Sequence, residues 1–371
     1  MKKKVMYIVQ SAGGVERYIQ MLLKYCDKNL YENILVCSYD YKRENYENLV
    51  SGFYNVEMCR EINLLTDIKA ILMVRSLIKK VKPDIIYVHS SKGGAIGRIA
   101  NLGIKNDVIY NPHGWAFCME CSQNKKKIYR IVEKILSRVT DKIIAISECE
   151  KTRALTNKIC LEEKIEVILN GIDVEEYDNK LETYKIKGRE ELNIPIDSYV
   201  IGLVGRICYN KAPEIFLKAA YEIKKKIPDC FFILVGDGPE RNNIEKLIDN
   251  YGLSNNVLIT GWVDNPLDYI YNFNQGMLLT RWEGFGLVLA EYMVANVPVI
   301  ATNIDSIPEI IVNEYNGLLV EINNVEQIIE ACERIYHNKN FKDYLVLNGH
   351  HAVRNKFDVK RVAMEHNILF S

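Results

Sequence analysis

Apolar residues in this chain form short continuous runs that alternate with stretches of helical periodicity. Such a run followed by a helix is typical of a parallel strand that is covered on both faces. In the first half of the chain the pattern predicts strands over residues 5–9, 33–38, 85–89, 107–111, 142–146 and 165–168. The helices predicted between these strands cover residues 15–25, 65–81, 95–102 and 124–139.

The periodicity fades over residues 172–198, where charge is dense, and then restarts. The second half predicts strands over residues 199–204, 230–235, 256–260, 276–280, 297–301 and 317–320. Its predicted helices cover residues 212–226, 240–251 and 287–295, and the chain is helical again from about 325. The pattern therefore predicts an α/β protein with two doubly wound domains, 1–172 and 173–357, and a last helix, 358–371, that packs back on the first domain.

Composition is that of an ordinary soluble protein, with 371 residues, 48% hydrophobic and 26% charged. The length favours two domains, and a net charge of zero argues against nucleic-acid binding. The ten cysteines are scattered, several of them in predicted strands, which indicates a reducing compartment rather than a disulfide framework. No stretch approaches the ~20 apolar residues of a membrane span, so we expect a cytoplasmic protein.

A predicted strand, a Gly-rich turn and a helix carry two carboxylates, Glu283 before the helix and Glu291 inside it. The backbone N–H groups of Phe285, Gly286 and Leu287 would lie at the helix start, where no helical carbonyl pairs with them. Such a terminus attracts anions, and a diphosphate fits it. Two solvated glutamates beside an ordinary turn would explain the spacing equally well, so other parts of the chain have to decide.

Two cations lie in a loop that follows another predicted strand of the second half. Arg206 and Lys211 flank the loop that follows the strand at 199–204. If both face the helix start at Gly286, they form a site for a leaving diphosphate, because Arg offers a planar fork and Lys a point charge. Taken alone, they would be two surface cations near a turn. The loop that contains Val263 could contact the flat base of a nucleotide through its backbone groups.

The first domain has two loops of interest. Gly13 and Gly14 follow the first strand, where adjacent glycines either let a ligand approach or form a plain tight turn. His113 ends another strand, between Pro112 and Gly114. Since ligands of open α/β sheets bind outside the carboxyl ends of the strands, this position favours a functional histidine over a structural one.

The helix predicted at 124–139 is basic and amphipathic. The cations on or near its polar face are Lys125, Lys126, Lys127, Arg130, Lys134 and Arg138. One interpretation is a solvated face, and the other is a patch for anionic lipid headgroups or a diphosphate-bearing acceptor. Cys118 and Cys121 form one Cys-x-x-Cys pair, but a zinc site of this kind needs a second pair that the sequence lacks.

Taken in order, these motifs resemble the retaining glycosyltransferases of family 4, which have the GT-B fold. The matching segments are Gly13-Gly14 with Glu16, Pro112-His113-Gly114, Ser147-Glu148, Asn170-Gly171-Ile172-Asp173, Gly205-Arg206 with Lys211, 236–240 and 283–291. The stretch from Ser90 to Arg98, with 112–117, is most similar to the branch that builds bacterial capsular and exopolysaccharides. The sequence departs at 303–309, where relatives often carry a glycine pair before the Pro-Glu.

The resemblance implies a cleft between two Rossmann-like domains, with the acceptor on the first and the donor on the second. It implies a hexosyl- or N-acetylhexosaminyltransferase that uses a nucleotide diphosphate-sugar, with a UDP-sugar favoured. The acceptor would be a lipid-diphosphate-linked glycan or a polysaccharide in cell-surface glycan synthesis, and no divalent metal or other cofactor would be required. The enzyme would sit peripherally at the inner face of the cell membrane, where the basic helix contacts anionic lipids.

The resemblance also implies roles for single residues. The donor diphosphate would be held by Arg206, Lys211, Gly14 and the amides of Phe285, Gly286 and Leu287. Glu291 would accept hydrogen bonds from the ribose hydroxyls, and Glu283 would contact hydroxyls of the transferred sugar. His113 would lie near the sugar and the reacting centre.

Two other functions fit the same residues. A sugar-nucleotide epimerase shares the two-domain fold and the nucleotide diphosphate cleft, and it would need no acceptor. A non-catalytic partner of a transferase would bind only the donor or a lipid. The intact pairs Glu283/Glu291 and Arg206/Lys211 argue against such a loss of activity.

Overall fold

The structure is a computed structural model that describes residues 2–10, 12–59, 61–183 and 188–371. It divides into two compact units, Met1–Gly171 with Val359–Ser371 and Ile172–Asp358, and each is described by itself. Two predicted segments contain residues outside this description. They are the turn that includes Ser11 and the dense-charge segment that includes 184–187.

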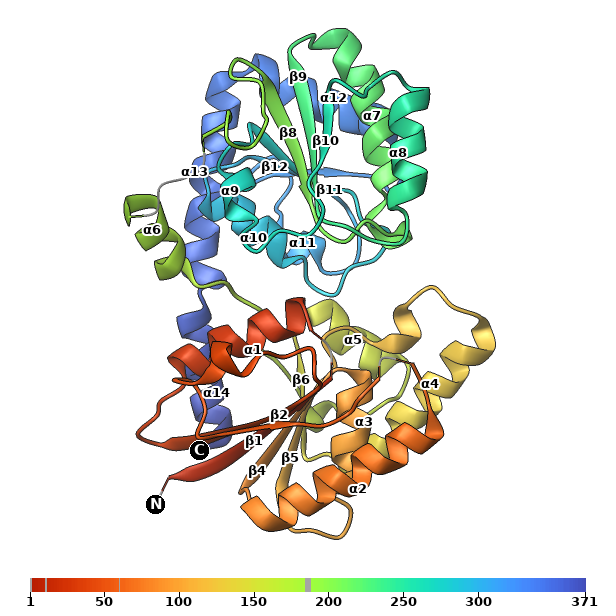
Figure 1. Ribbon diagram of the computed structural model, residues 1–371, viewed down its shortest axis with the longest axis vertical. Helices are drawn as coiled ribbons and strands as arrows, with labels where there is room; N and C mark the ends of the chain where they lie inside the picture. Colours follow the sequence, from red (N-terminus) through yellow and green to blue (C-terminus); the bar gives the residue numbers. More distant parts are fainter. Residues whose placement is uncertain (1, 11, 60, 184–187) are drawn as a thin grey trace. The chain divides into compact units, whose positions relative to one another are not determined.

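The first unit is built on a seven-stranded parallel sheet of order β3-β2-β1-β4-β5-β6-β7 (Figure 1). Its strands are β1 (Lys3–Val9), β2 (Tyr31–Cys37), β3 (Gly52–Asn55), β4 (Ile85–His89), β5 (Asp107–Asn111), β6 (Lys142–Ala145) and β7 (Ile165–Val167). The six predicted strands are confirmed, each with ends within two residues of the prediction. The sequence did not predict β3, because this short edge strand contains no continuous apolar run.

Helices cover both faces of this sheet, which explains the continuous apolar runs of its central strands, such as residues 5–9 of β1. The helices are α1 (Gly14–Tyr25), α2 (Leu64–Val81), α3 (Ser91–Ala100), α4 (Gln123–Leu136), α5 (Glu148–Thr156) and α14 (Val359–Phe370). Helices α1 and α14 pack on the face formed by Val5, Tyr7 and Val9. Helices α2, α3 and α5 pack on the opposite face, against Met6 and Ile8.

Helix α3 begins earlier than predicted. The sequence predicted a loop up to Gly94 and a helix from residue 95, whereas the helix starts at Ser91. A Cβ atom at Gly93 would lie 3.1 Å from the backbone nitrogen of Gln10, and one at Gly94 would lie 2.4 Å from the ring of Tyr110. The prediction was wrong because these glycines allow close packing of a helix on the sheet and do not form a loop.

The second unit has a six-stranded parallel sheet of order β10-β9-β8-β11-β12-β13. Its strands are β8 (Tyr199–Val204), β9 (Cys230–Val235), β10 (Val257–Ile259), β11 (Gln275–Leu278), β12 (Val299–Thr302) and β13 (Leu318–Val320). Its helices are α6 (Val174–Thr183), α7 (Pro213–Lys226), α8 (Arg241–Asn250), α9 (Leu267–Ile270), α10 (Leu287–Val294), α11 (Ile307–Ile310), α12 (Val325–His337) and α13 (Lys339–Lys356). Short 3₁₀ helices in the two units are η1 (Arg43–Tyr46), η2 (Ala116–Cys118), η3 (Ser137–Val139), η4 (Glu162–Lys164) and η5 (Tyr209–Lys211). All six strands predicted for this half are confirmed, again within two residues at each end.

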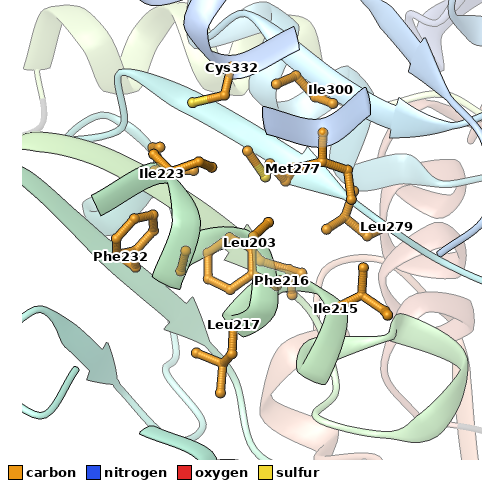
Figure 2. Packing of buried hydrophobic residues seen from close by; sticks show 14 of the residues in the cluster. Leu203, Ile215, Phe216, Leu217, Ile223, Phe232, Met277, Leu279, Ile300 and Cys332 are labelled. Carbon is orange, nitrogen blue, oxygen red and sulfur yellow. The ribbon is translucent and has the colours of Figure 1, made fainter. Parts of the chain in front are cut away.

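The main core of the second unit lies between its sheet and helices α7, α8 and α12. Figure 2 shows Phe216 of α7 beside Phe232 of β9, and their rings meet edge to face with centroids 6.0 Å apart. Met277 of β11 and Cys332 of α12 belong to the same cluster. This core fixes the sheet whose strand ends carry the predicted site.

In both sheets the strand order reverses beside the first strand of the unit. The reversal lies between β1 and β4 in the first unit and between β8 and β11 in the second. Loops that leave two such strands at their carboxyl ends run in opposite directions and leave a crevice, which is where open α/β sheets bind ligands. The loops after β1 and β4 in the first unit, and the loops after β8 and β11 in the second, are therefore the structural candidates for ligand sites in their own units.

Candidate functional site

The loops after β8 and β11 are joined by hydrogen bonds at the strand reversal of the second sheet. The N–H of Arg281 donates to the carbonyl of Asn210 at 2.7 Å, and the hydroxyl of Thr280 donates to the same oxygen at 2.8 Å. Beside them, the ammonium of Lys211 forms an ion pair with a carboxylate oxygen of Glu283. Only 18% and 15% of these two side chains are exposed. The structure thus brings together two predicted site residues that are 72 positions apart in the chain.

The loop after β9 supports the loop that carries Arg206. Gly236 has a φ of +142°, and a Cβ atom there would lie 2.1 Å from the carbonyl oxygen of Gly205. Because no side chain intervenes, the two loops approach closely enough for Ile207 N–H to donate to the carbonyl of Asp237 at 2.9 Å. Arg206 lies between these contacts with its side chain exposed. A loop held by these backbone contacts therefore presents this cation to solvent.

Helix α10 starts directly after the turn that contains Glu283. Gly286 precedes its first residue with a φ of +92°. The N–H groups of Phe285, Gly286 and Leu287 have no acceptor within the part of the chain that the structure describes. These three donors, together with the helix dipole, are available to an anion.

Asp305 is a site residue that the sequence analysis did not single out. Its carboxylate accepts a hydrogen bond of 2.8 Å from the backbone N–H of Glu283. Its φ is +53°, a left-handed conformation that favours glycine and that Asp and Asn tolerate better than most residues. The sequence signal was the missing glycine pair at 303–309. The structure indicates that Asp305 takes up the left-handed position there and holds the turn that presents Glu283.

Two further predicted donor residues lie in the same unit. Glu291 is 5% exposed and lies on α10, in the helix whose start carries the available amides. Val263 is half-buried in the loop after β10, next to Trp262, which is 72% exposed. The roles of Glu291 and Val263 toward a nucleotide stay predictions.

In the first unit, His113 lies after β5, with a φ of +51°. Its Nε2 is 3.0 Å from Nδ1 of His89, the last residue of β4. The ring of Tyr18 meets the His113 ring edge to face, with centroids 4.8 Å apart. Burial lowers the pKa of His113 to about 3 and the pKa of His89 well below its ordinary value, so both rings are neutral at pH 7. Gly14 starts α1 after Gly13, whose φ is +87°.

The surface of α4, the helix predicted as basic and amphipathic, carries both cations and apolar side chains. Lys125 and Lys127 are exposed and Lys126 is half-buried, whereas Arg130 donates to Asn157 at 3.3 Å. Between the lysines runs an exposed apolar stripe at helical spacing, made of Ile128, Ile131, Val132 and Ile135, with 54, 58, 40 and 56% of each residue exposed. The helix therefore exposes cations and large aliphatic side chains on the same surface.

Two other observations concern the described residues as a whole. None of their helices is long and apolar enough to cross a bilayer. No disulfide joins Cys118 and Cys121, or any other pair of the described cysteines.

Comparison with known proteins decides the family. The family model "Glycosyltransferase Family 4" matches residues 12–176, and the model "Glycosyl transferases group 1" matches residues 185–351. The capsular polysaccharide biosynthesis glycosyltransferase CapM of Staphylococcus aureus is 31% identical over 324 residues, which is 85% of this chain and 83% of CapM. The chain belongs to the glycosyltransferases.

The glycosyltransferase has further relatives along nearly its full length. An Escherichia coli UDP-Gal:alpha-D-GlcNAc-diphosphoundecaprenol alpha-1,3-galactosyltransferase is 29% identical over 362 residues, 94% of this chain and 92% of the relative. Among solved structures, Anabaena Alr3699/HepE in complex with UDP superposes with a TM-score of 0.80 at 20% identity, covering 100% and 99% of the two chains. WaaG, a glycosyltransferase of lipopolysaccharide biosynthesis, gives a TM-score of 0.75 at 14% identity, with 99% coverage of both chains. The glycosyltransferase therefore has the predicted GT-B architecture of two Rossmann-like domains.

Proposed function

We propose that this glycosyltransferase moves a hexosyl or N-acetylhexosaminyl group from a UDP-sugar to a lipid-diphosphate-linked acceptor in cell-surface glycan synthesis. The sugar would keep its anomeric configuration, and no divalent metal would be needed. The observation that carries the proposal is the meeting of Lys211 and Glu283 at the strand reversal of the second unit, on loops that also carry Arg206 and the available amides. Two comparisons support the choice of substrates. One E. coli relative is named for UDP-Gal and GlcNAc-diphosphoundecaprenol, and HepE has been solved in complex with UDP.

The chemistry follows from the charges at this site. Breaking a glycosyl–phosphate bond leaves an oxocarbenium-like sugar and a more negative diphosphate. Arg206, Lys211 and the amides at the start of α10 would stabilise that negative charge, the task a metal ion performs in other enzymes. When the diphosphate draws Lys211 toward itself, an oxygen of Glu283 is released and can accept a hydrogen bond from a sugar hydroxyl.

The remaining predicted residues complete the proposal. Glu291 would accept hydrogen bonds from the ribose hydroxyls, and the backbone at Val263 would contact the base. His113 would lie near the transferred sugar, and Gly14 would allow close approach of the diphosphate. The acceptor hydroxyl would attack the face that the diphosphate leaves, and a diphosphate oxygen would take its proton, so that no side-chain base is required.

Transfer assays with defined substrates test this function. A panel of UDP-sugars is incubated with a polyprenyl-diphosphate-linked N-acetylhexosamine, with and without EDTA, and the anomer of the product is determined by NMR. Removing one preorganised charged donor typically costs 10²–10³ in rate, so we expect Lys211→Ala to lower kcat/KM at least ~10²-fold. We expect a similar loss for Glu283→Ala, and folded protein in both cases by circular dichroism.

Lys218→Ala is the matched control, because Lys218 is an exposed lysine on the neighbouring helix α7. We expect this variant to transfer sugar at the wild-type rate. Wild-type kcat/KM in both site variants, or loss of turnover in EDTA, would contradict the proposed mechanism. Release of an epimerised sugar nucleotide in the absence of acceptor would instead identify an epimerase.

We further propose that α4 docks the enzyme on the anionic inner face of the cell membrane. Inserting a half-exposed isoleucine contributes about 1 kcal/mol, and each lysine near an anionic surface adds about 1 kcal/mol. Several of each lie on one helix surface, so together they suffice for reversible binding. A protein held there would meet a lipid-linked acceptor directly.

Flotation with phosphatidylglycerol-containing vesicles measures this binding. Ile131→Asp removes an apolar contact and adds a repelled charge, so we expect at least ~10-fold weaker binding. The control is Leu347→Asp, which changes a residue of α13 that is 56% exposed, close to the 58% of Ile131. Equal flotation of both variants and the wild type, or binding that is insensitive to salt, would exclude α4 as the docking surface.

A further inference from the structure

A buried polar cluster lies beneath His113 in the first unit, and it involves residues to which neither the sequence motifs nor the transfer chemistry assigns a role. His89 contributes from the end of β4, Tyr87 from the middle of the same strand, Tyr18 from α1 and His366 from the C-terminal helix α14. The four side chains are all less than 3% exposed. Buried polar groups of this kind are retained only when their hydrogen bonds hold them in defined orientations.

The hydrogen bond between His89 and His113 can contain only one proton. Both rings are neutral, so each has one N–H and one lone pair. In one arrangement His89 Nδ1–H donates to His113 Nε2, and in the other His113 Nε2–H donates to His89 Nδ1. The second arrangement places the proton of His89 on its Nε2.

The environment of His89 Nε2 distinguishes the two arrangements. This atom is buried and has no hydrogen-bond partner among the residues that the structure describes. A buried N–H without an acceptor costs about 1–3 kcal/mol, and orphaned donors are rarer in proteins than orphaned acceptors. His89 therefore carries its proton on Nδ1, where His113 Nε2 accepts it at 3.0 Å.

We infer that His89 is a positioning residue that holds His113 in its Nδ1–H tautomer, so that His113 acts in transfer as a hydrogen-bond donor and not as a base. Nε2 of His113 is already occupied as an acceptor, and its Nδ1 makes no hydrogen bond to any described residue. His113 as a whole residue is half-buried, unlike the fully buried His89, and its Nδ1–H is the polar group that it can offer to a substrate oxygen. The inference rests on the proposed place of His113 beside the transferred sugar.

The rest of the cluster holds the orientation of the ring. His366 Nδ1 lies 2.8 Å from the carbonyl of Val362, one turn earlier in α14, and therefore carries the proton. Its Nε2 has one lone pair, which accepts from the hydroxyl of Tyr87 at 2.9 Å, and the hydroxyl of Tyr18 lies 3.1 Å from the same nitrogen. Tyr18, fixed at its hydroxyl, packs its ring edge to face on His113. Helix α14 thereby supports His113 through Tyr18.

Nitrogen-15 NMR of the whole chain, labelled at its six histidines, tests the tautomer without any substrate. Long-range proton–nitrogen spectra distinguish a protonated from an unprotonated ring nitrogen, and the His113 signals are assigned by their loss in His113→Asn. We expect His113 to show a protonated Nδ1 and an unprotonated Nε2 at pH 7. A protonated Nε2 in the wild type would overturn the inference.

Variants of His89 then test the cause. His89→Ala removes the donor and leaves room for a water that can accept from Nε2–H, the form that neutral imidazole favours by itself, so we expect His113 to move to the Nε2–H form. His89→Asn places an amide N–H near the former Nδ1 and should keep the Nδ1–H form. Val88→Ala is the control, because it removes buried methyl groups from the same strand but faces the other side of the sheet. An unchanged His113 tautomer in His89→Ala would overturn the role of His89.

Kinetics link the tautomer to transfer. Losing one oriented hydrogen bond corresponds to a ~10-fold loss, which we expect in kcat of His89→Ala with little change in the KM of the donor. We expect His89→Asn to keep most of the wild-type kcat. Likewise, His113→Asn should retain more activity than His113→Gln, because the Asn amide lies near Nδ1 and Asn tolerates the φ of +51°. A switched tautomer with unchanged kcat would refute the proposed role of His113 and leave the tautomer assignment intact.

Discussion

The buried ion pair between Arg98 of α3 and Glu133 of α4 allows a prediction that can be worked out from the structure. The Arg98 Nη2 atom lies 2.9 Å from Glu133 Oε2, and the side chains are 0% and 5% exposed. Tyr110 donates to the other Glu133 oxygen at 2.9 Å, and its ring lies 3.8 Å from the Arg98 guanidinium. This cluster attaches α4, the proposed membrane helix, to the rest of the first unit. The perturbation is Arg98→Met, which keeps an unbranched apolar stem up to about the position of Nε and removes the charged guanidinium.

The expected cost follows from two opposing terms. At 2.9 Å and an effective dielectric constant of about 20, the two charges attract by about 6 kcal/mol. Desolvating each ion costs several kcal/mol, and Arg98 Nη1 has no partner among the described residues, which adds to the cost. The pair as a whole therefore contributes little to stability. Removing Arg98 alone leaves Glu133 buried without its cation, which should cost about 3–5 kcal/mol.

Hydrogen–deuterium exchange of peptides from α3 and α4 measures the effect locally. A loss of about 3–5 kcal/mol corresponds to opening that is roughly 10²- to 5 × 10³-fold more frequent, so protection in these helices should fall by that factor in Arg98→Met. The triple variant Arg98→Met, Glu133→Met, Tyr110→Phe removes both charges and the hydroxyl that would lose its acceptor. We expect its protection to return to within ~10-fold of the wild type. A triple variant as unprotected as Arg98→Met would refute this reasoning.

Two further predictions concern the site and the C-terminal helix. Asp305→Ala removes the acceptor for the Glu283 N–H and should lower kcat/KM ~10-fold. Asp305→Asn retains an acceptor and should keep most of the activity. Equal kcat/KM in the two variants, measured by steady-state kinetics, would contradict this role of Asp305. Burial lowers the pKa of His366 to about 4, below the ~6.5 of an exposed imidazole, so the unfolded chain binds more protons between these values. The free energy of unfolding of the first unit should therefore fall by about 3 kcal/mol as the pH drops from ~6.5 to ~4. In urea titrations His366→Gln should show a flatter pH dependence, and an unchanged slope would exclude this histidine as its source.

The sequence by itself determined the order and nature of the main elements. Continuous apolar runs and helical periodicity are local patterns, so β8 and β9 were predicted with the bounds they have in the structure. The ordered motifs also identified the family, because each loop residue such as Lys211 or Glu283 follows a strand whose end can be located from the sequence. The two wrong predictions also have local causes. Strand β3 is a short edge strand without an apolar run, and the glycines of α3 resemble the composition of a loop.

Only the tertiary structure decided which of these residues meet. The contacts of Lys211 with Glu283, Arg98 with Glu133 and His89 with His113 join residues 72, 35 and 24 positions apart. Such pairs depend on strand order and on which face of a helix packs inward, and neither is written in the local pattern of one segment. The same holds for the apolar stripe of α4, since periodicity shows that a helix has an apolar face but not whether another element covers it.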